Sequence, residues 1–230
     1  MFKYSYKKLL SAFLEKNYKS IFFNELDINK DNQLILRHDI DFDIDLALQM
    51  AKIENSINMK STYFFLLRSE SYNLISEENI EHLSKIKELG HKLSIHFDLM
   101  LYEDVNFGLN QEIKLFQSYF EDEIDIISIH RPNEDFLKNP ENFFTIHNSY
   151  EKRFTKDNIS YYADSRGSFR FGDPLDSDCF KENKNIQLLT HPIWWMTGEK
   201  NISSCVDKVI SNKEDELRNY FKKNITTFKG

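Results

Sequence analysis

Two kinds of hydrophobic pattern alternate along the chain. Apolar residues recur at helical spacing in three stretches, Leu46 to Ile57, Ile80 to Leu89 and Leu109 to Phe120. Short apolar runs of strand length lie between and after these stretches: LIL, TYFFLL, KLSI, DIISI, YYA and QLL. Such alternation is typical of stacked βα units, in which parallel strands are buried on both faces.

The pattern predicts one α/β domain that covers residues 1–230, with six or seven parallel strands joined by right-handed crossovers. A closed or incomplete barrel and a doubly wound open sheet both fit this number of strands. No linker rich in Pro, Gly or Ser divides the chain. The stretch 133–158 lacks a clear period and is expected to be an insertion over one face, and Ile202 to Ile225 predicts a charged outer helix.

Charge and cysteine content exclude several classes of protein. The chain has 37 acidic and 30 basic residues, a net charge of −7, and its lysines form no basic stripe, so nucleic acid is not an expected partner. The two cysteines, Cys179 and Cys205, have neither metal-type nor redox spacing. Reduced thiols and a cytoplasmic location are therefore expected.

Neither a targeting segment nor a membrane span is expected. The apolar patch LLSAFL near the N-terminus is short and is followed at once by Glu15 and Lys16, so it predicts an amphipathic helix and not a signal peptide. No apolar run approaches the length of a transmembrane helix.

Residues that are common in active sites follow five of the apolar runs, always at the carboxyl end. Because the carboxyl ends of parallel strands share one face of the sheet, we expect these side chains to converge. An aspartate with histidines from other strands makes a site for zinc or a similar divalent ion, and a second carboxylate can act as a general base. The residues concerned are Arg37, His38, Asp39 and Asp41; His96 and Asp98; His130 and Arg131; Asp164 and Arg166; and His191.

These segments, taken in order, resemble the polysaccharide deacetylase superfamily, the homologues of the nodulation-factor chitooligosaccharide deacetylase. The likeness is greatest to a divergent branch associated with bacterial surface-polysaccharide gene clusters. Each motif alone is weak, whereas five in family order over most of the chain are fairly specific. They are RHDID at 37–41, GHKLSIHFD at 90–98, SIHRP at 128–132, YYADSRGSFRFGDP at 161–174 and LLTHPIWW at 188–195.

The resemblance implies a distorted or incomplete (β/α) barrel of about seven parallel strands, of the deacetylase type. It also implies hydrolysis of N- or O-acetyl groups on sugars with a divalent metal ion, expected to be zinc. By position in the motifs, the implied roles are Asp39 as base, Asp41 and His96 as metal ligands, Arg131 as the residue that orients the base, His191 as acid, and Asp164 as the partner of His191.

One position departs from the family pattern. The usual second motif has another histidine four residues after the first, but this chain has Met100 there, and a thioether is a poor zinc ligand beside carboxylate and imidazole. The third ligand is then His130 or Asp98, or the site binds metal weakly or not at all. We favour His130 because it ends its own strand.

Simpler interpretations exist for several of these residues. Asp39 and Asp41 also suit a solvated helix N-terminus. Trp194 and Trp195 suit core packing as well as a sugar-stacking wall of the pocket, with position after His191 favouring the wall. From their location in the fourth motif, Tyr162, Arg166 and Arg170 are expected to bind the substrate, and the two arginines would suit an anionic one.

The sequence therefore predicts a metal-dependent hydrolase that removes an acyl group, with acetyl as the leading expectation, from an amino sugar or glycan precursor used in surface-polysaccharide synthesis. A metal-dependent phosphoesterase on a related barrel remains an alternative, since it uses the same residue types. So does a non-catalytic glycan-binding relative of the deacetylases, because of Met100.

Overall fold

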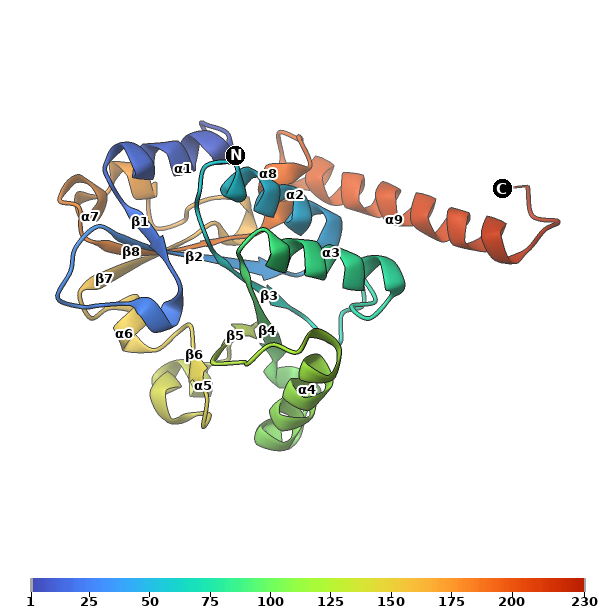
Figure 1. Ribbon diagram of the computed structural model, residues 1–230, viewed down its shortest axis with the longest axis horizontal. Coiled ribbons are helices and arrows are strands. Elements are labelled where there is room, and N and C mark those ends of the chain that lie inside the picture. Colours follow the sequence, from blue (N-terminus) through green and yellow to red (C-terminus); the bar gives the residue numbers. More distant parts are fainter. Residues whose placement is uncertain (1, 230) are drawn as a thin grey trace.

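A curled parallel β-sheet forms the centre of the protein, and helices cover its outer side (Figure 1). The computed structural model describes residues 2–229. The sheet order is β6-β5-β4-β3-β2-β8-β7, with β1 added to β2, and all pairs are parallel. The strands are β1 Lys19–Ile21, β2 Gln33–Ile40, β3 Thr62–Phe65, β4 Lys92–Asp98, β5 Ile126–His130, β6 His147–Asn148, β7 Ile159–Ala163 and β8 Asn185–Thr190.

Strands β6 and β7 stand at the two ends of this order and do not pair with each other. The sheet is thus an incomplete (β/α) barrel, which confirms the predicted fold class. The α-helices are α1 Tyr6–Glu15, α2 Ile44–Asn55, α3 Glu77–Glu88, α4 Val105–Phe120, α5 Glu134–Lys138, α6 Lys152–Thr155, α7 Asp178–Lys181, α8 Pro192–Met196 and α9 Ile202–Asn224.

The three helices predicted from apolar spacing are α2, α3 and α4, and each begins at a polar capping residue. The side chains of Asp43, Ser76 and Asp104 accept hydrogen bonds from backbone N–H groups in the first turn of their helices. The stretch 133–158, which has no clear period in the sequence, contains the short elements α5, β6 and α6. These elements are too short to produce a recognisable hydrophobic period.

Two sets of side chains alternate along β2, whose eight residues are all buried. Leu34 and Leu36 pack in a cluster with α1 and α2, on the helix side of the sheet. Ile35 packs on the opposite side, in the interior of the barrel. Because strand side chains alternate with a period of two, Arg37 and Asp39 lie on the interior side with Ile35.

A buried carboxylate ties the helix side of the sheet together. Glu54 of α2 accepts hydrogen bonds from Tyr6 Oη at 2.5 Å, Tyr63 Oη at 2.7 Å and Ser61 Oγ at 2.7 Å, and it lies 2.7 Å from His38 Nε2. Burial raises the pKa of Glu54, but His38 and these donors outweigh it and hold the pKa at about 2. The network holds α1 and α2 against β2 and β3, near the carboxyl end of β2.

Within residues 2–229, no helix combines the length and the hydrophobicity that crossing a membrane requires.

Candidate metal centre and active site

Six of the residues predicted to form a site lie together at the carboxyl ends of the strands: Asp39, Asp41, His96, His130, Asp164 and His191. His38, which was also expected there, faces Glu54 on the helix side of the sheet. Strand parity explains this convergence. Asp39 and His130 each stand four residues after an interior-facing isoleucine, Ile35 and Ile126. His96 stands between Ile95 and Phe97, which pack on the helix side, so it also faces the interior. His191 follows β8 directly, and Asp41 follows β2 by one residue. Five segments that are distant in sequence therefore deliver their polar side chains to one end of the barrel.

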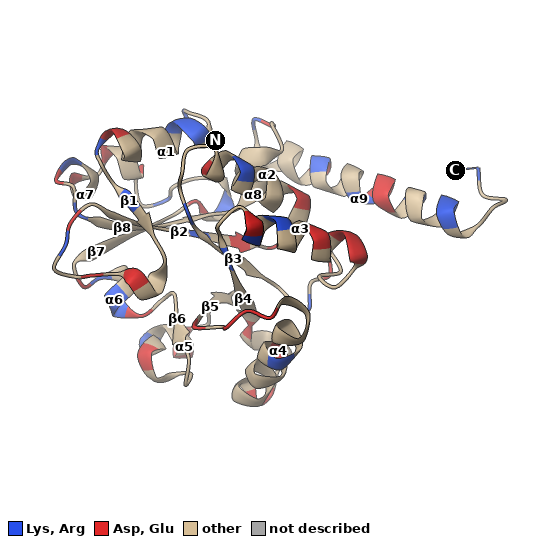
Figure 2. Cartoon of the chain, viewed as in Figure 1, with Lys and Arg blue, Asp and Glu red and all other residues tan. Residues whose placement is uncertain are grey.

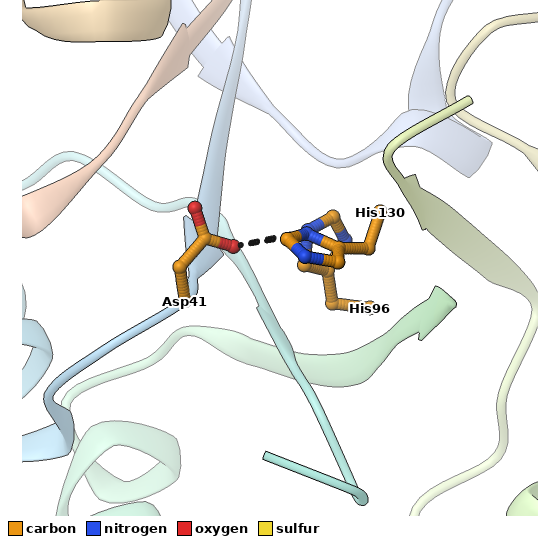
Figure 3. A group of neighbouring side chains, drawn as sticks. All are labelled: Asp41, His96 and His130. Atoms are coloured by element: carbon orange, nitrogen blue, oxygen red, sulfur yellow. Dashed lines mark hydrogen bonds and ion pairs between the residues drawn. The ribbon is translucent and has the colours of Figure 1, made fainter. Parts of the chain in front are cut away.

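Asp41, His96 and His130 form a compact triangle of ligand-type atoms (Figure 3). Asp41 Oδ1 lies 3.2 Å from His96 Nε2 and 3.4 Å from His130 Nδ1, and the two nitrogens are 3.1 Å apart. Donors bound tetrahedrally at about 2.1 Å from one ion lie roughly 3.4 Å from each other. The three observed separations are close to that value.

The donor set fits a divalent ion such as zinc. One carboxylate oxygen with two imidazole nitrogens leaves a fourth tetrahedral position for water or substrate, as in catalytic zinc sites. Asp41 Oδ1 is buried and has no hydrogen-bond partner among the described residues, a costly arrangement that a cation would relieve. His96 Nδ1 is 2.5 Å from Ser128 Oγ, a contact that orients the ring and turns its Nε2 toward the triangle.

The side chains around the triangle bear on the question of the third ligand. Met100 is 67% exposed and is not one of the three clustered residues. Asp98 is directed elsewhere: its carboxylate accepts a hydrogen bond from Arg131 Nη2 and another, at 3.0 Å, from the Met100 backbone N–H. Of the two candidates considered, His130 is the one that lies within ligand distance of Asp41 and His96.

Asp39 stands beside the triangle as a buried, ionised carboxylate. Arg37 grips it with two hydrogen bonds, Nε to Oδ1 at 3.0 Å and Nη2 to Oδ2 at 2.7 Å, and Ser128 Oγ donates to Oδ1 at 3.0 Å. Burial raises the pKa of Asp39, but the Arg37 and His96 charges outweigh it and hold the pKa at about 2. His96 Nδ1 is 3.8 Å from Asp39 Oδ2, so the carboxylate borders the candidate metal centre.

The contact expected of Arg131 is made by Arg37. Arg131 was predicted to orient Asp39, but its guanidinium pairs with Asp98 and its side chain is 62% exposed. The backbone at Arg131 is left-handed, with φ 50°, and this turn directs the side chain outward from the strand end. Arg37 has no exposed side-chain surface and stacks over the Tyr150 ring at 4.7 Å.

On the other side of Asp41, His191 and Asp164 form a hydrogen-bonded pair. His191 Nδ1 is 2.6 Å from Asp164 Oδ1, and His191 Nε2 is 3.8 Å from Asp41 Oδ2. Burial lowers the pKa of His191, but Asp164 outweighs it and raises the pKa to about 9. The Trp195 indole N–H donates to Asp164 Oδ2 at 2.7 Å, which fixes the second carboxylate oxygen.

Asp41 itself is strongly acidic. Burial raises its pKa, but the nearby His130 and His96 rings and the charge of His191 outweigh burial, so the pKa lies well below the usual range of an aspartate. An ionised Asp41 is the protonation state that a metal ligand needs.

A cavity of about 240 Å³ adjoins the triangle and is lined by Asp41 and His130. Its wall combines apolar side chains with the charged residues Arg68, Glu70, Asp98 and Arg131. Charged groups beside metal-ligand atoms provide partners for a hydroxyl-rich substrate.

The residues predicted to bind substrate lie outside that cavity. Trp195 packs in the protein, with its ring stacked on Phe2 at a centroid distance of 3.8 Å. Trp194 and Trp195 both line a separate cavity of about 460 Å³ beside Phe2. Tyr162 is half-buried against the helix-side cluster, and Arg166 and Arg170 are exposed. Their substrate-binding roles remain predictions.

Sequence reasoning placed Arg37 at the site without giving it a role, and it did not identify Ser128. Both stand two residues before a predicted site residue on the same strand, Arg37 before Asp39 and Ser128 before His130. The period of two was therefore the signal that placed them on the same face. The contact of Trp195 with Asp164 had no such signal, because it depends on the turn into α8.

Neither a protein-family model nor a curated protein matches the chain. Among solved structures, it is similar to a family 4 carbohydrate esterase from Bacillus anthracis, with 14% identity, coverage of 90% of this chain and 86% of that chain, and a TM-score of 0.47. It is similar to the chitin deacetylase from the fungal pathogen Colletotrichum lindemuthianum, with 13% identity, 85% and 87% coverage, and a TM-score of 0.44.

A CE4 family pseudoenzyme from Bacillus anthracis is also similar, with 11% identity, coverage of 83% of this chain and 63% of that chain, and a TM-score of 0.45. At these identities and TM-scores, the similarities do not determine what this chain does.

Proposed function

We propose that the protein is a metal-dependent hydrolase that removes an acyl group, with acetyl as the leading candidate, from an amino sugar or glycan precursor. The observation that supports this most directly is the triangle of Asp41, His96 and His130, with an ionised carboxylate on one side and a histidine–aspartate pair on the other. These are the parts that metal-assisted hydrolysis of an amide or ester requires.

Asp41, His96 and His130 would hold the metal ion, for which zinc is the proposed identity. When bound, such an ion supplies Lewis-acid polarisation of the acyl carbonyl and acidifies a water molecule. The residues of the chain orient this chemistry: Ser128 holds the His96 ring, and Arg37 holds Asp39.

Asp39 acts as general base in this proposal. The Arg37 guanidinium keeps it ionised at neutral pH and fixes both carboxylate oxygens, so the oxygens stay at the edge of the site and accept a proton from the attacking water. The Ser128 hydroxyl restricts Oδ1 further.

His191 acts as general acid. With a pKa raised to about 9, it is protonated at neutral pH and has a proton to give to the departing amine or alcohol. Asp164 accepts a hydrogen bond from Nδ1–H, so the Nε2–H faces the site on the side of Asp41. Trp195 holds Asp164 in the orientation that this pairing needs.

The cavity beside His130 and Asp41 supports a sugar as the substrate, because its charged and hydroxyl-bearing wall provides partners for sugar hydroxyls. The cytoplasmic location follows from the cysteine pattern, and the role in surface-polysaccharide synthesis follows from the sequence resemblance; both stay predictions.

Hydrolysis assays with matched variants test this proposal. Wild-type protein, loaded with zinc, should release acetate from an acetylated amino sugar or a small chromogenic acetyl ester, but should not release phosphate from phosphorylated sugars. Asp39→Asn should lower turnover by about 10²-fold or more, the usual contribution of a general base, with zinc content unchanged. Asp135→Asn, an aspartate with an 84% exposed side chain, is the control and should keep full activity.

Three results would count against the proposal. Full acetate release by folded Asp39→Asn removes the assigned base. Phosphate release without acetate release favours the phosphoesterase alternative. Zinc binding with neither reaction on any acylated sugar favours a non-catalytic glycan-binding protein.

A further inference from the structure

The last helix, α9, leaves the body of the protein (Figure 1). Its first half is anchored: Cys205 and Val209 are buried in a cluster with Leu46 and Ile193, and Lys213 pairs with Asp43 at 3.6 Å. From residue 214 to the end of the helix at 224, every residue is exposed. A helical segment of this length is marginal in water without tertiary packing.

The exposed part carries an apolar stripe that is distinct from the face packed on the body. Val206, Ile210, Leu217 and Phe221 are 38%, 60%, 56% and 41% exposed, respectively. With about 100° between successive residues, these four fall within roughly 60° of the helix circumference, while Cys205 and Val209 lie roughly 110° away. Apart from Phe228, whose ring centroid is 6.3 Å from that of Phe221, the stripe thus has no partner within the described part of the chain.

After Lys208 and Lys213, α9 has an acidic segment, Glu214 to Glu216, and then a basic segment with Arg218, Lys222 and Lys223 (Figure 2). At about 100° per residue, Glu214 and Arg218 lie beside the stripe, on the same side of it, whereas Asp215, Lys222 and Lys223 face away from it. A second copy of the helix in antiparallel orientation sets its basic segment beside the acidic segment of the first. A parallel pair would set like charges side by side.

We propose that the apolar stripe of α9 binds the same stripe of a second copy of this chain, as an antiparallel helix pair about a two-fold axis. In one antiparallel register, Glu214 lies opposite Arg218 of the second copy. The same register sets Ile210 within one residue of the position opposite Phe221 of the second copy. It also brings the two Leu217 side chains together near the axis. An interface with two-fold symmetry is self-complementary and closed, so it yields a dimer and not a filament.

Charge reversal gives the sharpest test of this arrangement. Glu214 and Arg218 also pair within one helix, with Arg218 Nη2 at 2.7 Å from Glu214 Oε1, so the test must separate this intrahelical contact from the proposed contact between helices. In Glu214→Arg, arginines face arginines across the axis, and in Arg218→Glu, glutamates face glutamates. Mixing the two variants creates two attractive cross-helix pairs and leaves the intrahelical repulsion in each chain unrepaired. Only an intermolecular contact recovers on mixing.

The experiment uses native mass spectrometry and sedimentation velocity on the full chain. Wild type is expected to be a dimer, and each charge variant alone should dissociate at least about tenfold more readily. An equimolar mixture should give predominantly the heterodimer. Leu217→Glu should be monomeric, whereas Phe171→Glu, at an apolar residue that is 84% exposed and lies far from α9 in sequence, should stay dimeric. Far-UV circular dichroism checks that α9 stays helical in each variant.

A monomeric wild type overturns the proposal, and so does a dimer that Leu217→Glu leaves intact. Homodimers of both charge variants as stable as wild type, or a mixture without heterodimer enrichment, overturn the antiparallel register. The metal centre and its hydrolytic assay are independent of these outcomes, since α9 contributes none of the clustered ligands.

Discussion

Replacement of Arg37 by methionine tests the internal support of the candidate site. The substitution keeps an unbranched side chain of similar length but removes the guanidinium that binds both oxygens of Asp39. Arg37 is 0% and Asp39 is 2% exposed, so water cannot replace the lost partner without rearrangement. The remaining contact of the carboxylate is the hydroxyl of Ser128.

Breaking a buried ion pair from one side typically costs about 3–5 kcal/mol, because the other charge stays buried without compensation. The pKa of Asp39 shows the same opposition: burial raises it, and Arg37 is the first of the groups that hold it down at about 2. Loss of Arg37 should therefore raise this pKa. A cost of this size is a large part of the roughly 5–15 kcal/mol by which domains are stable.

The assay is urea unfolding of four proteins: wild type, Arg37→Met, Asp39→Asn and the double variant. Arg37→Met should lower the free energy of unfolding by about 3 kcal/mol or more. Adding Asp39→Asn to Arg37→Met should recover at least about 2 kcal/mol, because the neutral amide no longer needs a cation. Acetate release should be lost in all three variants.

An Arg37→Met variant that unfolds within about 1 kcal/mol of wild type would refute this reasoning, as that is the value of an exposed pair. A double variant less stable than both single variants would do the same, because the stabilisation would then not come from the pairing of the two charges.

Three further predictions concern other buried groups. The pKa of Glu54 is about 2 in the folded protein against 4.5 in the unfolded chain, so the ionised carboxylate stabilises the fold above about pH 4.5 and this stabilisation is lost as the pH falls toward 2. Glu54→Gln should therefore weaken the acid dependence of the free energy of unfolding by up to about 3 kcal/mol. Burial raises the pKa of Glu112 to about 7, so wild type loses stability as the pH rises from about 4.5 to 7. In thermal unfolding, Glu112→Gln should be more stable than wild type at about pH 8 and no more stable than wild type at about pH 4. Trp195→Phe removes the hydrogen bond to Asp164 and should lower kcat for acetate release about tenfold at unchanged zinc content; an unchanged kcat would exclude a positioning role for Trp195.

The architecture was predictable from sequence because the signals were periodic. The apolar spacing in α2, α3 and α4 identifies helices, and the runs between them identify buried strands, so the parallel sheet and the end at which polar residues gather follow from general rules. The proximity of Asp41, His96 and His130 follows from the same rules, because each residue lies within two positions of the carboxyl end of a strand.

Contacts that depend on turn geometry were not predictable. Arg131 and Arg37 both stand near a strand end, and only the left-handed backbone at Arg131 decides that its side chain leaves the site. Trp195 occupies the first turn after His191, where a small change in helix direction decides between a pocket wall and a packed ring. The protrusion of α9 is also invisible in sequence, since its charged pattern suits packing on the outside of a domain equally well.

The proposal that one divalent ion binds to Asp41, His96 and His130 is tested most directly by zinc content together with the zinc X-ray absorption spectrum of protein prepared without chelator. The expected result is one zinc per chain, with two imidazole nitrogens and carboxylate oxygen at about 2.0–2.1 Å. His130→Ala should lose most of the metal, whereas His147→Ala, at a histidine with a 60% exposed side chain, should keep it. Full zinc content in His130→Ala, or a wild-type spectrum without imidazole ligands, would contradict the proposed metal centre.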